Sequence, residues 1–382
     1  MQAVAIGWYL YDLTGSAMTL AYAGLAVFAP IALFTLPGGD VADRFDRRRI
    51  LVAAHLVQAV CAGTLVALAS ARTMTAAPFY AVLALSGTAR AFSGPAVPSL
   101  LPMLVPRERF PNAVALSSSA NQTAVVLGPA VGGLIYLLGP EVTFGACLAM
   151  SLLVAFCMGS IRTRRPTEVT FSGTAISRAL EGLRYLRVRP ILLGAISLDL
   201  FAVLLGGITG LLPIYARDIL GVGPQGLGLM RSSMAVGAVS MAIVLAHLPA
   251  RRQPHAGRAL FGGVALFGAA AMAFSVSTSF LLSVAVLAVM GAADMLSVFV
   301  RASVIQLGSP DEMRGRVSAV HMLFVGATNE LGDFRAGSMA AWLGAVPAAL
   351  AGGVATLVVV ALWRALFPEL RAVERLSEIK SA

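Results

Sequence analysis

Charge is what this sequence lacks most. Of its 382 residues, 12% are charged and 58% are hydrophobic, and the mean hydropathy is +0.85. A soluble domain carries about 25% charged residues, so this chain cannot cover a globular surface with polar groups. Uncharged runs of about 20 residues recur along it, which is the length that a helix needs to cross a bilayer. The sequence therefore predicts an all-α membrane protein.

Lysine, histidine and cysteine are also rare. The 28 basic residues include one lysine, Lys380, and the arginines sit between apolar runs, so they indicate topology rather than nucleic-acid binding. The four histidines form no metal-ligand spacing. The three cysteines lie inside apolar runs and are expected to be small core residues. No Gly-x-x-x-x-Gly-Lys motif is present, which argues against ATP-driven transport. We expect no metal, no cofactor and no enzymatic activity.

The apolar runs predict twelve helical spans in two sets of six. The spans are expected at a short segment ending near Leu10 and then at about 20–39, 50–71, 76–105, 113–138, 142–161, 191–216, 222–249, 259–276, 280–307, 317–341 and 345–366. The first span has only about ten apolar residues, too few to cross. Either the stated start is late, or span 1 is incomplete.

The predicted domains follow from this division. They are an N-terminal bundle (1–161), a linker (162–188), a C-terminal bundle (189–367) and a tail (368–382). Arginines concentrate in every second link and in the tail, whereas the opposite links carry only Arg72 and Arg217. Cytoplasmic loops are rich in Lys and Arg, so the linker, the tail and the C-terminus are predicted to be cytoplasmic. Apolar residues at 176, 180, 183 and 186 predict an amphipathic helix on the membrane surface. A solvated linker is the alternative.

An internal repeat supports the two bundles. Sliding the sequence by 204 residues places Pro106 on Pro310 and Gly128 on Gly332, among other matches with the same offset. A common offset over weak matches is typical of transporters built from repeated bundles. The sequence therefore predicts two parallel six-span repeats.

A dense group of charged residues interrupts the apolar sequence between spans 2 and 3. Seven of the ten residues 40–49 are charged. The segment GDVADRFDRR (39–48) resembles the loop signature of the major facilitator superfamily, with Asp46 in place of the family's second glycine. Asp tolerates a left-handed turn better than most residues, so we expect the family's turn to be kept at Asp46. The resemblance implies a cytoplasmic charge lock between the bundles, and a plain topology signal is the alternative. The residues of this gate motif are Gly39, Asp43, Arg44, Arg47 and Arg48.

Two further motifs carry the same resemblance. Span 5 contains Gly128, Pro129, Gly132 and Gly133, which resemble the Gly-Pro signature of the superfamily's antiporters and imply export. Ordinary glycine-rich helix packing is the alternative. Span 4 contains Arg90, four residues before a glycine, which resembles a motif tied to proton coupling in drug–proton antiporters.

Ionisable residues inside the predicted spans are candidate coupling residues, because a charge in a membrane is costly and usually functional. The candidates are Arg90, Asp199, Asp294, Arg301 and Glu330. The repeat superposes Arg90 on Asp294, so we expect these two to pair across a central cavity. Static salt bridges that fix packing are the alternative. Asp333 and Arg335 lie closer to a span end, where a structural role is expected.

Two more stretches, DLTGS (12–16) and SPDEMRGRV (309–317), resemble the bacterial exporters related to the enterobactin exporter. The resemblance implies a proton-coupled exporter of a siderophore, a drug or a similar small amphipathic molecule, working by alternating access. We expect a monomer in the inner membrane of a bacterial-type cell, whose partners are its small-molecule substrate, protons and the lipid bilayer. A non-transporting sensor or degenerate transporter of the same fold is the alternative.

Overall fold

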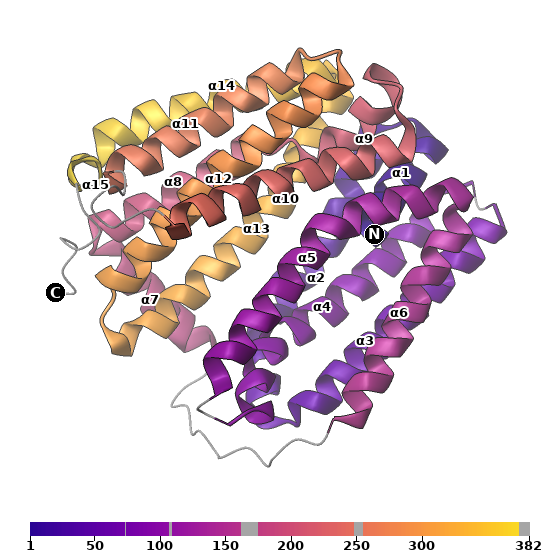
Figure 1. The fold of residues 1–382 in the computed structure, drawn as a ribbon, viewed down its shortest axis with the longest axis horizontal. Helices are drawn as coiled ribbons and strands as arrows, with labels where there is room; N and C mark the ends of the chain where they lie inside the picture. Colours follow the sequence, from indigo (N-terminus) through magenta and orange to yellow (C-terminus); the bar gives the residue numbers. More distant parts are fainter. Residues whose placement is uncertain (73, 107–108, 162–174, 248–254, 374–382) are drawn as a thin grey trace. The chain divides into compact units, whose positions relative to one another are not determined.

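The computed structural model describes the chain except residues 73, 107–108, 162–174, 248–254 and 374–382 (Figure 1). Helices dominate the described residues, and no strand occurs among them. The chain divides into two compact units. Unit 1 comprises Met1–Gly15 and Tyr22–Ser177, and unit 2 comprises Ser16–Ala21 and Arg178–Ala382. The prediction of an all-α fold is confirmed.

Unit 1 holds most of the first six helices. They are α1 (Gln2–Thr14), α2 (Ala17–Arg44), α3 (Arg47–Ser70), α4 (Ala77–Leu104), α5 (Phe110–Ile135) and α6 (Pro140–Ser160). Helix α3 packs against both α4 and α6 (Figure 1). A short 3₁₀ turn, η2 (Tyr136–Leu138), leads to Gly139, whose φ of 114° makes the sharp corner before α6. Glycine adopts such a backbone without the strain that a Cβ would cause.

Unit 2 holds the remaining helices. They are α7 (Ala175–Arg187), α8 (Pro190–Gly206), α10 (Gly223–His247), α11 (Ala256–Ser275), α12 (Phe280–Gly308), α13 (Asp311–Leu343), α14 (Ala345–Leu366) and α15 (Pro368–Ala372). Helix α12 packs on α10 and α11, and α11 packs on α14 (Figure 1). The core between these helices consists of aliphatic and aromatic side chains such as Leu198, Leu260 and Val304, all of which are fully buried.

Helix α7 is the amphipathic helix that the linker sequence predicts. Its Leu186 is 1% exposed in the core of unit 2, and its Glu181 carboxylate lies 2.6 Å from the Arg316 guanidinium at the start of α13. Arg184 is exposed, and so is Leu180, one of the four apolar positions from which the helix is predicted. The helix is confirmed, and its position at a membrane surface stays a prediction.

The seventh predicted span is not one continuous helix. Helix α8 ends at Gly206, and the chain continues as a 3₁₀ turn, η3 (Thr209–Leu211), a single turn of α-helix, α9 (Leu212–Ile214), and a π-helical turn, η4 (Tyr215–Ile219). The expectation of an unbroken helix over 191–216 is therefore wrong. Gly206 and Gly207 weaken the helix, and Pro213 lacks the N–H that a continuing helix would use, so it sits in the first turn of a new one.

Nine helical segments among the described residues are long and apolar enough to cross a membrane, and one of them, Pro190–Ile219, contains the break. The twelve predicted spans also include α1, α4 and α13. Helix α1 has only 13 residues, and α13 is long but carries charged residues from Asp311 to Arg335. Membrane crossing by α1, α4 and α13 stays a prediction.

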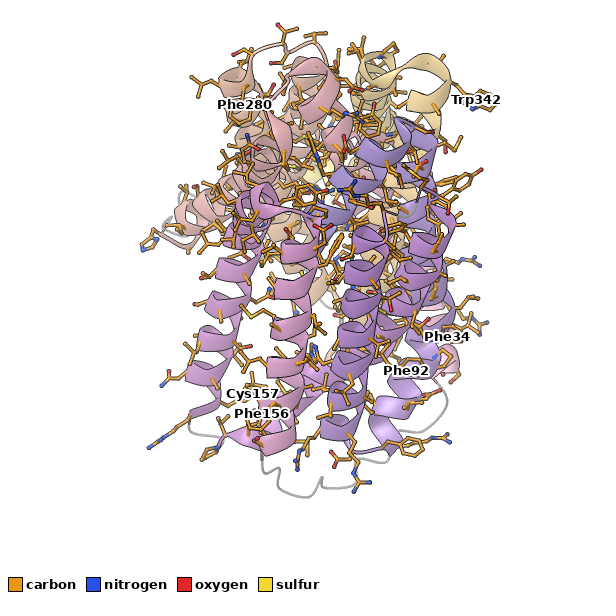
Figure 2. The ribbon with its side chains drawn as sticks, turned by 90° about the vertical axis from the view of Figure 1, so that its right-hand side faces the viewer. Phe34, Phe92, Phe156, Cys157, Phe280 and Trp342 are labelled. Atoms are coloured by element: carbon orange, nitrogen blue, oxygen red, sulfur yellow. The ribbon has the colours of Figure 1, made fainter. Side chains whose placement is uncertain are left out.

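Figure 2 labels side chains from both units. Phe34 of α2 and Phe92 of α4 stack with ring centroids 6.2 Å apart in unit 1. Phe280 at the start of α12 and Trp342 near the end of α13 lie at one end of unit 2. Cys61 is buried as expected, but Cys157 is exposed on α6, so the expectation of a core position is wrong for Cys157.

Candidate functional site

The most buried ion pair among the described residues joins Asp199 of α8 to Arg301 of α12. Asp199 is 5% exposed and Arg301 is 3% exposed. An isolated charge at such a position would be very costly, and an opposite charge in direct contact offsets much of that cost. The pair is surrounded by the apolar core of unit 2, where Leu198 and Val300 are fully buried neighbours in the sequence.

Two further ionisable groups lie beside this pair. Asp294 is half-buried and lies about two helical turns before Arg301, on the same face of α12. It interacts electrostatically with both Asp199 and Arg301. His321 of α13 is also half-buried and interacts with Arg301. We call Asp199, Asp294, Arg301 and His321 the acidic cluster. With His321 neutral, it holds two carboxylates against one guanidinium, a formal charge of −1.

A second group of charges gathers elsewhere in unit 2. Arg231 of α10 interacts electrostatically with Glu330 and Asp333 of α13, and Asp333 also interacts with Arg335. We call Arg231, Glu330, Asp333 and Arg335 the balanced cluster, because its two positive charges equal its two negative ones.

The balanced cluster binds the broken part of span 7. The Gly210 backbone N–H donates to Asp333 Oδ1 at 2.7 Å. The Arg335 guanidinium donates from Nε to the Leu204 carbonyl at 3.0 Å and from Nη2 to the Gly207 carbonyl at 3.1 Å. Three backbone groups at the helix break are therefore bonded by α13 side chains.

The two clusters lie at different positions along the helices of unit 2. Asp199 is about 14 Å along α8 from its first residue at 1.5 Å per residue. Arg335 is about 12 Å from the last residue of α13. Along α13 itself, His321 and Asp333 are about 18 Å apart.

The gate motif lies at the α2–α3 turn of unit 1. Asp46 has φ −62° and ψ 110°, so the expectation of a left-handed turn there is wrong. Its carboxylate instead accepts a hydrogen bond from the Arg48 N–H at 3.0 Å and caps α3. Arg48 Nε donates to the Met158 carbonyl near the end of α6 at 3.0 Å, and Arg47 Nη1 lies 3.3 Å from Met103 Sδ. These contacts tie three helices of unit 1 together.

The other gate-motif residues make fewer described contacts. Arg44 is exposed in the last turn of α2. A Cβ at Gly39 would meet nothing within 4 Å. The Asp43 side chain lies outside the described residues. A lock between the two bundles stays a prediction.

The remaining first-half candidates also lie in unit 1. Pro129 is inside α5, and a Cβ at Gly132 would lie 2.5 Å from Met1 Cα at the start of α1, so this glycine permits a close helix contact. A Cβ at Gly128 would lie 3.7 Å from the Met1 nitrogen, while Gly133 is buried. Arg90 is exposed on α4. Its pairing with Asp294 stays a prediction.

Sequence reasoning missed His321 and Gly210. Metal-ligand spacing does not single out His321, but its position as an ionisable residue in a predicted span does. Gly210 contributes only its backbone N–H, which has no side-chain signal. Among the described residues, no group of three or more His, Cys, Asp or Glu could hold a metal ion.

A protein-family model matches the whole chain. A family model described as "transmembrane secretion effector", of the major facilitator superfamily, matches residues 1–382. The macrolide efflux protein A of Streptococcus pyogenes is 34% identical over 133 residues, which are 35% of this chain and 33% of that protein. The protein of the same name from Enterococcus faecalis is 32% identical over 122 residues, 32% of this chain and 38% of that protein. Each match thus spans between 33% and 38% of the relative's length.

Solved transporters share the fold. The nucleoside transporter NupG superposes with a TM-score of 0.70 at 12% identity, covering 95% of this chain and 94% of that one. A D-xylose–proton symporter superposes with a TM-score of 0.69 at 13% identity, covering 100% of this chain and 97% of that one. At such low identity these likenesses concern the fold alone.

Proposed function

Since the chain belongs to the transmembrane secretion effector family of the major facilitator superfamily, we propose that it is a proton-coupled exporter of a small amphipathic molecule. The observation that carries the proposal is the acidic cluster. It places a buried ion pair, Asp199–Arg301, beside a second carboxylate, Asp294, within apolar helices.

The charge of the cluster supports proton coupling. One guanidinium can neutralise one carboxylate, so the second carboxylate is an excess negative charge in an apolar region. Binding one proton removes that excess, and releasing it restores the excess. A charge in the membrane interior is costly, so the protonated and deprotonated clusters favour different surroundings. An alternating-access cycle requires such a coupling between charge state and exposure.

Asp294 is the proposed proton carrier, and Asp199 the proposed partner that keeps Arg301 in place. Asp294 is half-buried, whereas Asp199 is almost fully buried and contacts Arg301 directly. A proton reaches a half-buried carboxyl group more easily than one sealed in an ion pair. Arg90, Glu330 and the gate-motif residues remain candidates for coupling and gating.

Export of an amphipathic molecule is supported by similarity to proteins named for macrolide efflux and by the resemblance of the α5 Gly-Pro motif to antiporters. The proposed cargo is a drug, siderophore or metabolite with a large apolar surface. The proposed location is a bacterial-type inner membrane. The proposed domains are two bundles, 1–161 and 189–367, a linker at 162–188 and a tail at 368–382. The linker, the tail and the C-terminus are on the cytoplasmic side, and the protein acts as a monomer.

The test is proton movement in inverted membrane vesicles. The vesicles are energised to acidify their interior, and a panel of siderophores and amphipathic drugs, including the macrolide erythromycin, is added. An exporter that exchanges cargo for protons collapses the pH gradient with one class of compound. Asp294→Asn is expected to abolish this response. Asp218→Asn, a half-exposed residue of η4 in the same unit, is the matched control and is expected to retain it.

The competing function is a non-transporting membrane sensor of the same fold. A buried Asp199–Arg301 pair that only fixes helix packing, and never changes its partners, would favour such a sensor. A correctly inserted protein that gives no response to any compound, with identical behaviour for Asp294→Asn, would support the sensor and contradict the exporter.

A further inference from the structure

We propose that Asp333 and Arg335 are positioning residues that hold the break in span 7 closed, so that residues 207–219 move together with α13. The inference goes beyond the proposed function, because it concerns how a helix break is controlled and not where a proton binds. It rests on hydrogen bonds within unit 2.

The break leaves polar backbone groups that the helices themselves cannot bond. The last carbonyls of α8 and the first amides of the η3–α9 turns have no partners within their own helices. In the hydrocarbon region no water is available to bond them, and such groups are tolerated only where protein satisfies them. A partner from outside span 7 is therefore required.

Helix α13 supplies a partner of the appropriate charge at each end. Asp333 accepts a hydrogen bond from the Gly210 N–H, in the first of the new helical turns. Arg335 donates to the carbonyls of Leu204 and Gly207, at the end of α8, where the dipole favours a cation. Both are charge-assisted hydrogen bonds, which are stronger than neutral ones.

The backbones approach closely at this contact. A Cβ at Gly332 would lie 2.9 Å from the Val203 carbonyl oxygen, and a Cβ at Gly210 would lie 3.1 Å from the Asp333 Cβ. Larger residues would push α13 away from the break and lengthen the hydrogen bonds. The two glycines therefore allow the close approach that the hydrogen bonds of Asp333 and Arg335 require.

The hydrogen bonds of Asp333 and Arg335 connect the break to a single helix, α13. Asp333 and Arg335 are two residues apart on α13, so a shift of α13 along span 7 would break both sets of bonds together. The charged groups that act on Asp333 are Arg335 and Arg231, and Arg231 also interacts with Glu330. The break is thus held by a group of charges drawn from α10 and α13.

The direct test is amide hydrogen exchange of the full-length protein in lipid nanodiscs, resolved to peptides that cover residues 204–214. Asp333→Ala and Arg335→Gln are expected to speed exchange at residues 207–211 by about tenfold or more, because each loses a charge-assisted hydrogen bond. Asp333→Asn is expected to give a smaller increase, because its amide oxygen still accepts a bond from Gly210. Peptides from the first half of α8 should not change.

Thr328→Val is the matched control on α13, because the Thr328 hydroxyl bonds only to carbonyls of its own helix among the described contacts. It should leave exchange at the break unchanged. Unchanged exchange at residues 207–211 in both Asp333→Ala and Arg335→Gln would overturn the proposal. An equal increase across all of unit 2 in every Asp333 variant, including Asp333→Asn, would also overturn it, since the role would then be general stability.

A transport readout separates this inference from the proposed function. With erythromycin as probe, Asp333→Asn is expected to slow the maximal rate by about threefold or more while the dependence on the pH gradient remains. If Asp333→Asn abolished that dependence and left exchange unaltered, Asp333 would be a coupling residue and the positioning role would be wrong. If the wild-type protein moved no compound, the exporter proposal would fail while the exchange result still decided this one.

Discussion

The two charged clusters of unit 2 solve the problem of buried charge in different ways. In the balanced cluster, Asp333 and Arg335 bond to backbone groups of a helix break. In the acidic cluster, Asp199 and Arg301 bond to each other, beside the further carboxylate of Asp294. Bonds to the backbone fix a chain in place, whereas bonds between side chains can be exchanged without moving a helix.

Charge balance strengthens the contrast. The balanced cluster is neutral when all four of its groups are ionised, so it needs no further ion. The acidic cluster is neutral only when it has taken up one proton. The comparison teaches that an ionisable residue inside a membrane protein has to be judged by its partners and by the sum of charges around it. Four predictions test this comparison, from the largest expected effect on stability to the smallest.

Arg301→Met is expected to destabilise the protein most. The substitution leaves Asp199 buried without its counter-charge, and removing one partner of a buried pair costs about 3–5 kcal/mol. The free energy of unfolding can be measured in mixed micelles. The double variant Asp199→Leu, Arg301→Met should recover most of that loss, because it removes the buried carboxylate together with its counter-charge and leaves the excess charge of Asp294 unchanged. A single variant within about 1 kcal/mol of wild type would mean that the pair is not buried as described.

Gly332→Leu is expected to lower stability by about 1–3 kcal/mol, because a side chain there overlaps the Val203 carbonyl. This change disrupts the contact on which the balanced cluster depends. Gly326→Leu is the control on the same helix, since a Cβ at Gly326 would meet nothing within 4 Å. Equal losses in the two variants would contradict the close approach at the break.

Trp363→Phe calibrates an ordinary neutral hydrogen bond outside both clusters. The Trp363 Nε1–H donates to Ser197 Oγ at 3.0 Å, and losing such a bond costs about 1 kcal/mol. Trp342→Phe is the control, because Trp342 is 84% exposed. It should shift the unfolding free energy by less than about 0.5 kcal/mol. Transport should survive both changes. Loss of transport in Trp363→Phe alone would mean that the Trp363–Ser197 hydrogen bond is needed for transport.

Asp294→Asn is expected to have the smallest effect on stability, within about 0.5 kcal/mol, because it removes the excess charge without breaking the Asp199–Arg301 pair. It should nevertheless abolish the dependence of transport on the pH gradient. Both quantities are measured on one preparation, by unfolding in mixed micelles and by uptake into inverted vesicles. A variant that stays fully coupled would place the proton on another group and remove the main distinction between the clusters.

Much of the helical architecture could be predicted from periodicity and composition. Runs such as 280–307 and 345–366 correspond to α12 and α14 with almost the same ends, because apolar length directly reflects the thickness of a bilayer. The amphipathic helix in the linker was also predictable, since its spacing of apolar residues is that of one helical face. The family followed from motifs that occupy the expected links and spans.

The break in span 7 could not be predicted with the same rules. Its glycines and Pro213 occur in a run that is apolar enough to span, and helices in membranes often tolerate such residues. What decides the outcome is α13, whose Asp333 and Arg335 bond the released backbone groups. Asp46 gave a similar error, because a turn-forming residue at a helix start can cap the helix instead of taking a left-handed conformation.

Composition is enough to identify this chain as a helical membrane protein and to identify its energetically costly residues, because charge is scarce and the apolar runs are long. Which charges meet depends on the fold. Asp199 and Arg301 are 102 positions apart, and Gly210 and Asp333 are 123 apart. Pairing over such separations depends on how helices pack against one another. Packing follows from the combined shape of many side chains, which no local pattern contains.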